Sequence, residues 1–269
     1  MFEIIKVIIL GVIEGVTEWL PISSTGHLIL ADEFLKLAQA PEFIEVFTVV
    51  IQLGAVLAVL SLYLNKLNPF QYKLHSKEFN QIIDLWKKIL VACVPAAIIG
   101  ILFDDIIDEY LFNPNVVALA LIIYGVAFLI VERRKWKPKV KSLQEITYRE
   151  ALKIGSFQVL ALVPGTSRSG ATILGGLISG VERTTTTEFS FFLALPVMLG
   201  ASLLKFVKLG FQFTAQEWGL LGLGSLVSFI VSILAIRFLL NYVKKNDFKL
   251  FGWYRIVLGL IVLAYFLIK

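Results

Sequence analysis

Apolar runs long enough to cross a bilayer recur along the whole chain, and short polar stretches separate them. A transmembrane helix needs about 20 mostly apolar residues. The pattern therefore predicts an all-α polytopic membrane protein with a single integral membrane domain, residues 1–269. The six expected transmembrane helices lie at about 43–64, 88–103, 114–131, 188–208, 217–240 and 251–268.

Two further apolar regions are each broken by a proline within a polar stretch. The first divides into segments at about 3–20 and 25–37, and the second into segments at about 151–163 and 168–180. None of these segments reaches the roughly 20 residues that a full crossing needs, and a proline disfavours helix at the residue before it. We therefore expect two re-entrant helical hairpins, each of which enters and leaves the membrane on the same side.

The loops between the predicted spans differ in charge. Those at 65–87, 132–150 and 241–250 are basic, whereas 104–109 is acidic. The basic loops fall on one face when crossings are counted, so the positive-inside rule makes that face cytoplasmic and opens the first hairpin toward the outer face. An amphipathic segment at 77–88 is expected at the membrane interface. The basic residues concerned are Lys66, Lys73, Lys77, Lys87, Arg133, Arg134, Lys135, Lys137, Lys139, Lys141, Lys244, Lys245 and Lys249.

The two halves of the chain resemble each other. Leu20–Ser24, LPISS, matches Val163–Ser167, VPGTS. Each half holds one hairpin and three crossings, and an odd number of crossings inverts the second copy relative to the first. We expect an inverted-topology repeat made of about 1–131 and 151–269, joined by a basic cytoplasmic linker at about 132–150.

Composition narrows the class of protein further. Hydrophobic residues make up 58% of the chain and charged residues 17%, with a mean hydropathy of +0.82, as in integral membrane proteins. Two histidines and one cysteine are too few for a zinc site rich in those residues. The net charge of +5 resides in short loops between spans, which argues against nucleic-acid binding.

The first hairpin carries an acidic pair inside its apolar segment. Glu14 and Glu18 are four residues apart and project from one helical face. A charged acid at bilayer depth costs roughly 2.5–3.5 kcal/mol on insertion scales. The two acids are either protonated or paired packing residues, or they form a general base, a metal site or both. Two carboxylates with water and phosphate oxygens suit Mg²⁺ or Ca²⁺ better than zinc.

Hydroxyls and a histidine follow the acids, in Ser23, Ser24, Thr25 and His27. The hydroxyls have an ordinary interpretation as helix caps. If Ser24 is the N-cap, His27 falls at N3 in the same first turn, and a hydroxyl beside an imidazole is the basic arrangement of an activated nucleophile. The free amides of that turn also form an anion site.

The second hairpin supplies a cation. Arg168 stands between Ser167 and Ser169, where the second helical segment begins. A buried arginine could simply neutralise the acids of the first hairpin. A guanidinium with hydroxyls and free amides at a helix N-terminus is also how proteins hold phosphate. The two interpretations are compatible if the ligand joins the ion pair when it binds.

On these motifs the chain resembles the bacitracin-resistance-type undecaprenyl-diphosphate phosphatases of bacterial plasma membranes. The motifs are EGVTEWLPISSTGH at 14–27 and PGTSRSGAT at 164–172, supported by FTVVIQLGAVLAV at 47–59 and EFSFFLALPVMLGA at 188–201. Members hydrolyse undecaprenyl diphosphate to the monophosphate and inorganic phosphate. This recycles the lipid carrier of cell-wall synthesis and gives resistance to bacitracin.

The resemblance implies a fold, a location and a set of site residues. It implies two re-entrant hairpins in an inverted repeat, in the bacterial plasma (inner) membrane, with bilayer lipids and the polyprenyl diphosphate as partners and the site open toward the outer face. One position departs from the family pattern, because Thr48 stands where members often carry an acid, and Glu45 lies on the same helical side. The implied catalytic residues are Glu14, Glu18, Ser24, His27 and Arg168, with Ser23, Thr25, Gly26, Thr166, Ser167, Ser169 and Gly170 around the diphosphate.

The sequence leaves three mechanisms open. Ser24 attacks the terminal phosphorus with His27 or a glutamate as base, His27 itself attacks, or a metal-bound water held by Glu14 and Glu18 attacks. A lipid-phosphate flippase is the competing class of function, because inverted repeats with broken helices are the usual architecture of alternating access. The prenyl chain length and the formation of a homo-oligomer are also left open.

Overall fold

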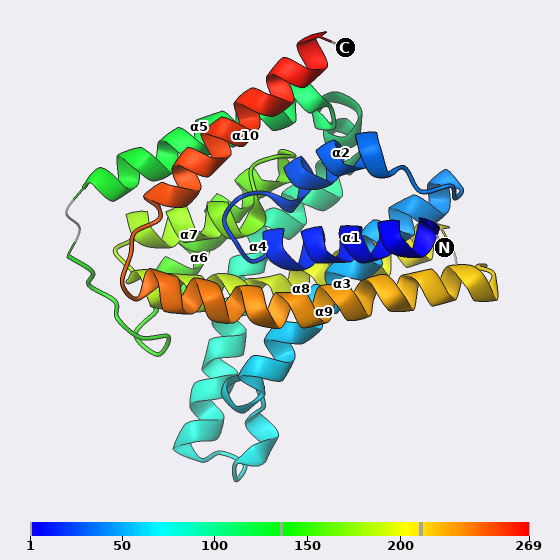
Figure 1. The fold of residues 1–269 in the computed structure, drawn as a ribbon. Coiled ribbons are helices and arrows are strands. Elements are labelled where there is room, and N and C mark those ends of the chain that lie inside the picture. Colours follow the sequence, from blue (N-terminus) through cyan, green and yellow to red (C-terminus); the bar gives the residue numbers. More distant parts are fainter. Residues whose placement is uncertain (1, 135–136, 210–211, 269) are drawn as a thin grey trace.

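The computed structural model describes residues 2–134, 137–209 and 212–268, which form a helical fold (Figure 1). Six of these helices are long and apolar enough to cross a membrane. The prediction of six spans in this order is therefore confirmed for the described part of the chain. The spans are α3 (Pro41–Leu67), α4 (Lys77–Leu111), α5 (Pro114–Arg133), α8 (Arg183–Leu209), α9 (Ala215–Val243) and α10 (Lys249–Ile268).

Shorter helices form where the two hairpins are expected. They have 16, 12, 11 and 11 residues, which is too short for a full crossing. A loop that contains a proline separates the members of each pair. The helices are α1 (Phe2–Thr17) and α2 (Ser24–Leu35) in the first pair, and α6 (Tyr148–Gln158) and α7 (Arg168–Ile178) in the second, with the 3₁₀ turns η1 (Pro69–Gln71) before α4 and η2 (Val159–Leu162) after α6.

Helix α4 differs from the prediction. The expected interfacial segment at 77–88 and the expected acidic loop at 104–109 both belong to this one helix of 35 residues. Ser76 caps the helix by accepting a hydrogen bond from the N–H of Phe79, and Pro95 lies inside it without ending it. The helix continues through the acids because apolar residues recur among them at helical spacing. Lys135 and the side chains of Asp104, Asp105 and Asp108 lie outside the described residues.

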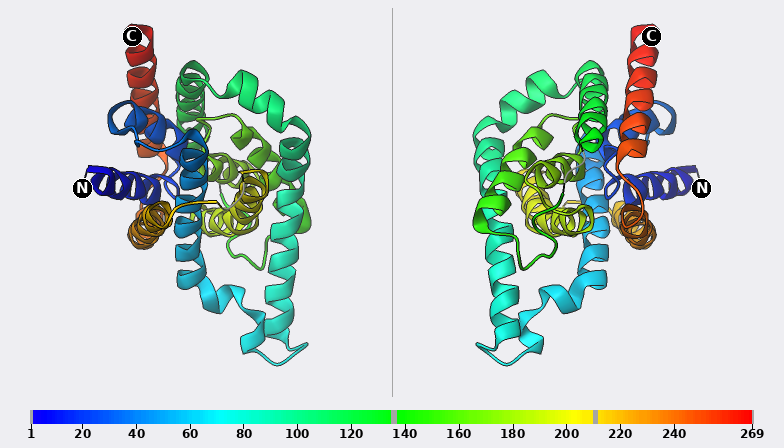
Figure 2. Two further views of the ribbon diagram at one scale, coloured as in Figure 1. Left: turned by 90° about the vertical axis from the view of Figure 1, so that its right-hand side faces the viewer. Right: turned by 90° about the vertical axis from the view of Figure 1, so that its left-hand side faces the viewer.

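Close helix contacts fix the position of α10. This helix packs along α5, while α9 packs against both α1 and α3 (Figures 1 and 2). A Cβ added at Gly125 of α5 would lie 2.7 Å from the main-chain oxygen of Gly252 in α10, so glycine is required there. Small residues of this kind let membrane helices approach closely and gain packing contacts.

Two ion pairs join helices α3 and α8, and α3 supplies the lysine of one pair and the acid of the other. Lys66, at the end of α3, lies 3.0 Å from Glu188, near the start of α8. Lys205, near the end of α8, lies 3.0 Å from Glu45, near the start of α3. The two helices therefore run antiparallel, and each contributes one acid near its start and one lysine near its end.

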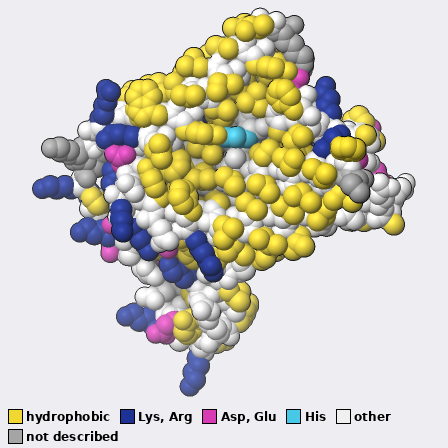
Figure 3. Space-filling view, viewed as in Figure 1, with side chains coloured by type: hydrophobic (Ala, Val, Ile, Leu, Met, Phe, Trp, Pro, Cys, Tyr) yellow, Lys and Arg dark blue, Asp and Glu magenta, His cyan; other side chains and the backbone are white. Residues whose placement is uncertain are grey.

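The surface supports a membrane setting. Figure 3 shows hydrophobic side chains over a broad face of the molecule, with most of the visible lysine and arginine side chains along its left and lower edges. The exposed apolar side chains include Trp253, Val257 and Leu260 of α10, which are 56%, 54% and 53% exposed. Exposed apolar surface of this extent is unusual for a monomer in water, and lipid is its natural contact.

Candidate active site

The first hairpin turns at Ser23. Its Oγ accepts a hydrogen bond from the N–H of Gly26 at 3.3 Å and so caps α2. Ser23, rather than Ser24, is therefore the N-cap, and His27 falls at N4 instead of N3. The φ angle of Ser23 is 73°, in the left-handed region that favours glycine. A serine suits this position nevertheless, because its hydroxyl accepts a hydrogen bond from one of the free amides at the start of the helix.

The second hairpin turns in the same way at Ser167. Its φ is 70°, and its Oγ accepts from the N–H of Gly170 at 3.1 Å, which caps α7. Ser23 thus corresponds to Ser167, whereas the sequence match paired Ser24 with Ser167. The match was wrong by one position, because the second loop has one more residue between its proline and its cap.

Glu18 joins the starts of α2 and α7. Its Oε2 accepts from the hydroxyl of Ser24 at 3.0 Å, and its Oε1 accepts from Nη2 of Arg168 at 2.9 Å. Ser24 and Arg168 are the first residues of their helices, so equivalent positions carry a hydroxyl in one hairpin and a guanidinium in the other. The side chains of Glu18 and Arg168 are 6% and 10% exposed, so the ion pair is largely buried.

The guanidinium of Arg168 is held in place by further contacts. Nη1 donates to the main-chain oxygen of Ser190 in α8 at 2.6 Å, and the ring of Trp19 lies 5.7 Å from Cζ. Nε has no hydrogen-bond partner among the described residues. Ser169, the next residue, donates its hydroxyl toward the main-chain oxygen of Glu18 at 3.2 Å. This hydrogen bond joins the second hairpin to the loop of the first hairpin.

Glu14 is fully buried in α1, and neither of its carboxylate oxygens has a hydrogen-bond partner within the described part of the chain. An unpaired buried carboxylate is costly, so these oxygens are suited to a cation or a proton. The described residues include no group of three or more His, Cys, Asp or Glu side chains that could hold a metal ion. A cation here would complete its shell with phosphate and water oxygens, as Mg²⁺ commonly does.

The imidazole of His27 has two partners, and Ser24 is not one of them. Nδ1 lies 2.7 Å from the main-chain oxygen of Ser23, and Nε2 lies 2.7 Å from the hydroxyl of Tyr254 in α10. The hydroxyl of Ser24 donates to Glu18 instead. The pairing of Ser24 with His27 that the sequence suggested is therefore not formed in this structure.

Sequence comparisons relate this site to known proteins. A family profile described as "Bacitracin resistance protein BacA" matches residues 7–261. The chain belongs to this BacA family. It is 54% identical over 266 residues to undecaprenyl-diphosphatase 1 of Clostridioides difficile (strain 630), with 99% of this chain and 97% of that protein covered. It is 57% identical over 267 residues to undecaprenyl-diphosphatase of Enterococcus faecalis (strain ATCC 700802 / V583), with 97% of each covered.

This BacA-family chain also has a buried arginine that the sequence analysis missed. Arg255 of α10 is 0% exposed and donates to the main-chain oxygens of Pro21 at 3.3 Å, Gly165 at 2.9 Å and Thr166 at 2.8 Å. It thereby ties α10 to the loops of both hairpins, and no ion pair to it occurs among the described residues. A signal was present, because Arg255 is the only charged residue of the predicted span 251–268, and charges inside spans mark functional sites.

Of the remaining predicted residues, Gly26, Gly170 and Thr166 contribute main-chain groups to hydrogen bonds, and Thr25 is partly exposed. Gly26 and Gly170 supply the N–H groups that the caps accept. A Cβ added at Gly170 would lie 3.0 Å from Nη1 of Arg255, so the glycine leaves room for the guanidinium. Thr166 is buried and Thr25 is half-buried.

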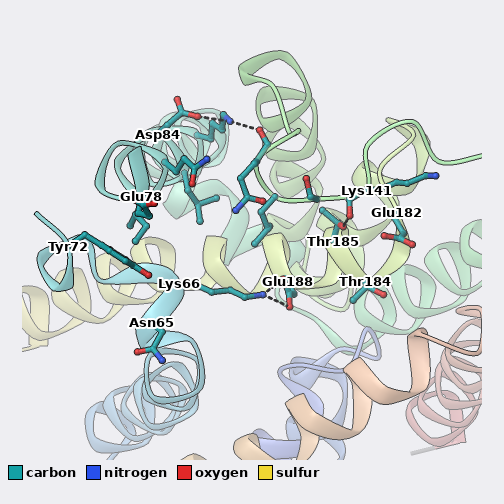
Figure 4. A pocket seen from close by; sticks show the side chains of 17 residues that line it. Asn65, Lys66, Tyr72, Glu78, Asp84, Lys141, Glu182, Thr184, Thr185 and Glu188 are labelled. Atoms are coloured by element: carbon teal, nitrogen blue, oxygen red, sulfur yellow. Dashed lines mark hydrogen bonds and ion pairs between the residues drawn. The ribbon is translucent and has the colours of Figure 1, made fainter. Parts of the chain in front are cut away.

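A separate polar cavity of about 560 Å³ lies among α3, α4, α8 and the linker (Figure 4). The ion pairs Lys66–Glu188 and Lys88–Asp84 stand in its wall, at 3.0 and 2.6 Å. None of the predicted site residues lines this cavity. The candidate active site of the BacA-family chain is therefore the meeting point of the two hairpin loops and not this cavity.

Proposed function

We propose that this chain hydrolyses undecaprenyl diphosphate to undecaprenyl phosphate and inorganic phosphate. One observation carries the proposal: a single carboxylate, Glu18, contacts both the hydroxyl of Ser24 and the guanidinium of Arg168. A hydroxyl, a carboxylate and a guanidinium thus lie within one chain of contacts, beside two helix N-termini that favour anions, and these are the groups that a nucleophile, a base and a phosphate-binding cation require. The names of the relatives favour a hydrolase over a flippase.

We further propose that both hairpins are re-entrant and belong to an inverted-topology repeat of 1–131 and 151–269, with 132–150 as the linker. The matching caps at Ser23 and Ser167 support this, because both adopt the same left-handed φ. The reciprocal ion pairs of the antiparallel helices α3 and α8 also support it. In such a repeat the broken helices meet near the midplane of the membrane.

The proposed setting is the bacterial plasma membrane, with the site open toward the outer face. The six apolar spans support the membrane setting, and the concentration of most visible basic side chains along the left and lower edges in Figure 3 supports the orientation. Ser24, Thr25 and His27 are half-buried rather than buried. The diphosphate group of a lipid can therefore reach these residues laterally from the bilayer, while the prenyl chain stays against the apolar face of the protein.

In the proposed reaction the terminal phosphate docks against Arg168 and the amides of the α7 start. The oxygen of Ser24 attacks the terminal phosphorus while its proton passes to Oε2 of Glu18. The bond from phosphorus to the bridging oxygen breaks, and undecaprenyl phosphate leaves. Water then cleaves the phosphoserine bond to release phosphate, and Glu18 returns the proton to Ser24. Positioning and charge stabilisation supply most of the catalysis in phosphoryl transfer.

A divalent cation, Mg²⁺ or Ca²⁺, is proposed at Glu14 and Glu18. The free carboxylate oxygens of Glu14 support this, since they are buried without a partner. When bound, the cation would neutralise charge that develops on the diphosphate. The residues of the chain still bind the phosphate and move the proton without it.

The deciding experiment measures phosphate release from undecaprenyl diphosphate by the purified protein in detergent, where no two-sided membrane exists. Release of phosphate supports a hydrolase. No release in the presence of Mg²⁺ or Ca²⁺ would refute the proposal. Rapid quenching with substrate labelled on the terminal phosphate identifies the nucleophile. Acid-stable label on the protein indicates Ser24, acid-labile label indicates His27, and no label indicates direct attack by water.

A further inference from the structure

The imidazole of His27 is held by two residues, Ser23 and Tyr254. Nδ1 contacts the main-chain oxygen of Ser23, and Nε2 contacts the hydroxyl of Tyr254, each at 2.7 Å. The two rings also lie nearly parallel, with an interplanar angle of 8° and centroids 5.6 Å apart. A half-buried side chain at the rim of a site would otherwise have several rotamers.

These contacts define the tautomer of the ring. A main-chain oxygen can only accept, so Nδ1 of His27 must carry the proton that points at Ser23. In the neutral ring Nε2 then has the lone pair, and the tyrosine hydroxyl donates to it. Because Nδ1 is turned into the helix start, Nε2 is the nitrogen that a substrate in the site can reach.

The position of Tyr254 is itself set by the site. Its neighbour Arg255 is buried and donates to main-chain oxygens in both hairpin loops. The backbone of α10 is thus held against the two loops at this point, whereas the side chain of Tyr254 is 45% exposed. The tyrosine side chain can therefore turn away from Nε2 without disturbing the packed core.

We propose that Tyr254 is a positioning residue for the hydrolysis: its hydroxyl donates to Nε2 of His27 and, together with the contact of Nδ1 to Ser23, holds the imidazole in the Nδ1–H tautomer with Nε2 turned toward the site. This inference rests on the proposed function. It applies whether His27 accepts a proton or attacks, because both roles need the lone pair of Nε2 in the same place.

The first test is NMR of the full chain in detergent with ¹⁵N-labelled histidine. The chain has two histidines, so His75→Gln leaves His27 as the single signal. We expect a protonated Nδ1 and an unprotonated Nε2, and we expect Tyr254→Phe to shift the Nε2 resonance by removing its donor. Tyr265→Phe, on the same helix, is the matched control and should leave the resonance in place. A protonated Nε2, or an unshifted resonance in Tyr254→Phe, would overturn the proposal.

The second test separates positioning from folding by steady-state kinetics. Tyr254→Phe keeps the stacked ring, so we expect an unchanged thermal midpoint and KM, with kcat lower by about three- to tenfold, as for loss of one neutral hydrogen bond. Tyr254→Leu, which also loses the ring, should lower kcat further. A kcat of Tyr254→Phe equal to that of the unmodified protein would overturn the inference. Absence of phosphate release from the unmodified protein would instead refute the proposed function, with the NMR signals unaffected.

Discussion

Glu18 and Arg168, which lie 150 positions apart in the chain, form an ion pair of 2.9 Å that joins the two hairpins. The pair lies at the first turn of both α2 and α7, where the free amides of two helices also gather. Breaking a buried pair leaves an uncompensated charge, so the chemistry and the cohesion of the site depend on the same contact.

Replacing Arg168 by methionine should lower kcat/KM at least about 100-fold, the usual cost of removing a donor that stabilises developing charge. Arg168→Lys should recover only part of the loss, because lysine lacks the planar fork that binds oxygen atoms in pairs. Phosphate release in detergent is the measurement. Lys205→Met is the control, since its ion pair with Glu45 is exposed and contributes little. Near-normal turnover in Arg168→Met would contradict the assignment.

Removal of divalent cations should suppress activity reversibly. With EDTA we expect phosphate release to fall more than about tenfold, and added Mg²⁺ or Ca²⁺ to restore it. Glu14→Gln should raise the cation concentration needed for half-maximal activity, because it removes the charge of the one site carboxylate whose oxygens are free. The measurement is a titration with each cation. Full activity in EDTA would show that the buried carboxylate holds a proton instead.

Arg255→Met should loosen both loops at once. Three main-chain oxygens lose a donor, and each unsatisfied buried group costs about 1–3 kcal/mol. We expect a lower thermal midpoint together with a fall in kcat, and a smaller effect for Arg255→Lys. Arg237→Met is the matched control, since this arginine is exposed on α9. An Arg255 variant with unchanged thermal stability and kcat would exclude a role for Arg255 in holding the two loops against α10.

Gly155→Ala should displace the second hairpin. A Cβ at this position of α6 would lie 2.0 Å from the main-chain oxygen of Ala92 in α4, and backbone atoms cannot yield by that amount. The yield of monodisperse protein and its thermal midpoint should both fall. Gly200→Ala is the control, because an added Cβ there meets nothing within 4 Å. If both variants behaved alike, the α4–α6 contact would not be as close as described.

The order of the apolar spans and the positions of the two pairs of short helices could be predicted from the sequence, because both follow from local composition. Hydropathy marks a span wherever it occurs, and a proline with polar neighbours marks a break. The continuation of α4 through its acidic end was missed, since charge indicated a loop while the helical spacing of the apolar residues persisted.

The details of the site depended on contacts between distant segments, which local patterns do not contain. Ser23 rather than Ser24 caps α2 because the turn of the loop brings the Oγ of Ser23 to the N–H of Gly26, which the sequence does not reveal. The partners of His27 and the role of Arg255 arise only once α10 lies against both loops. The rule that a lone charge within a span marks a site would have pointed to Arg255, but not to what it binds.

The contacts of Arg255 also impose an order on assembly. Both hairpins are synthesised before α10, since chains are made from the N-terminus. Until α10 has inserted beside α5, the main-chain oxygens of Pro21, Gly165 and Thr166 lack this donor. A partly inserted chain therefore carries every predicted catalytic residue, but its two loops still lack their contacts with Arg255. Catalytic competence should appear late in biogenesis, as the final helix docks.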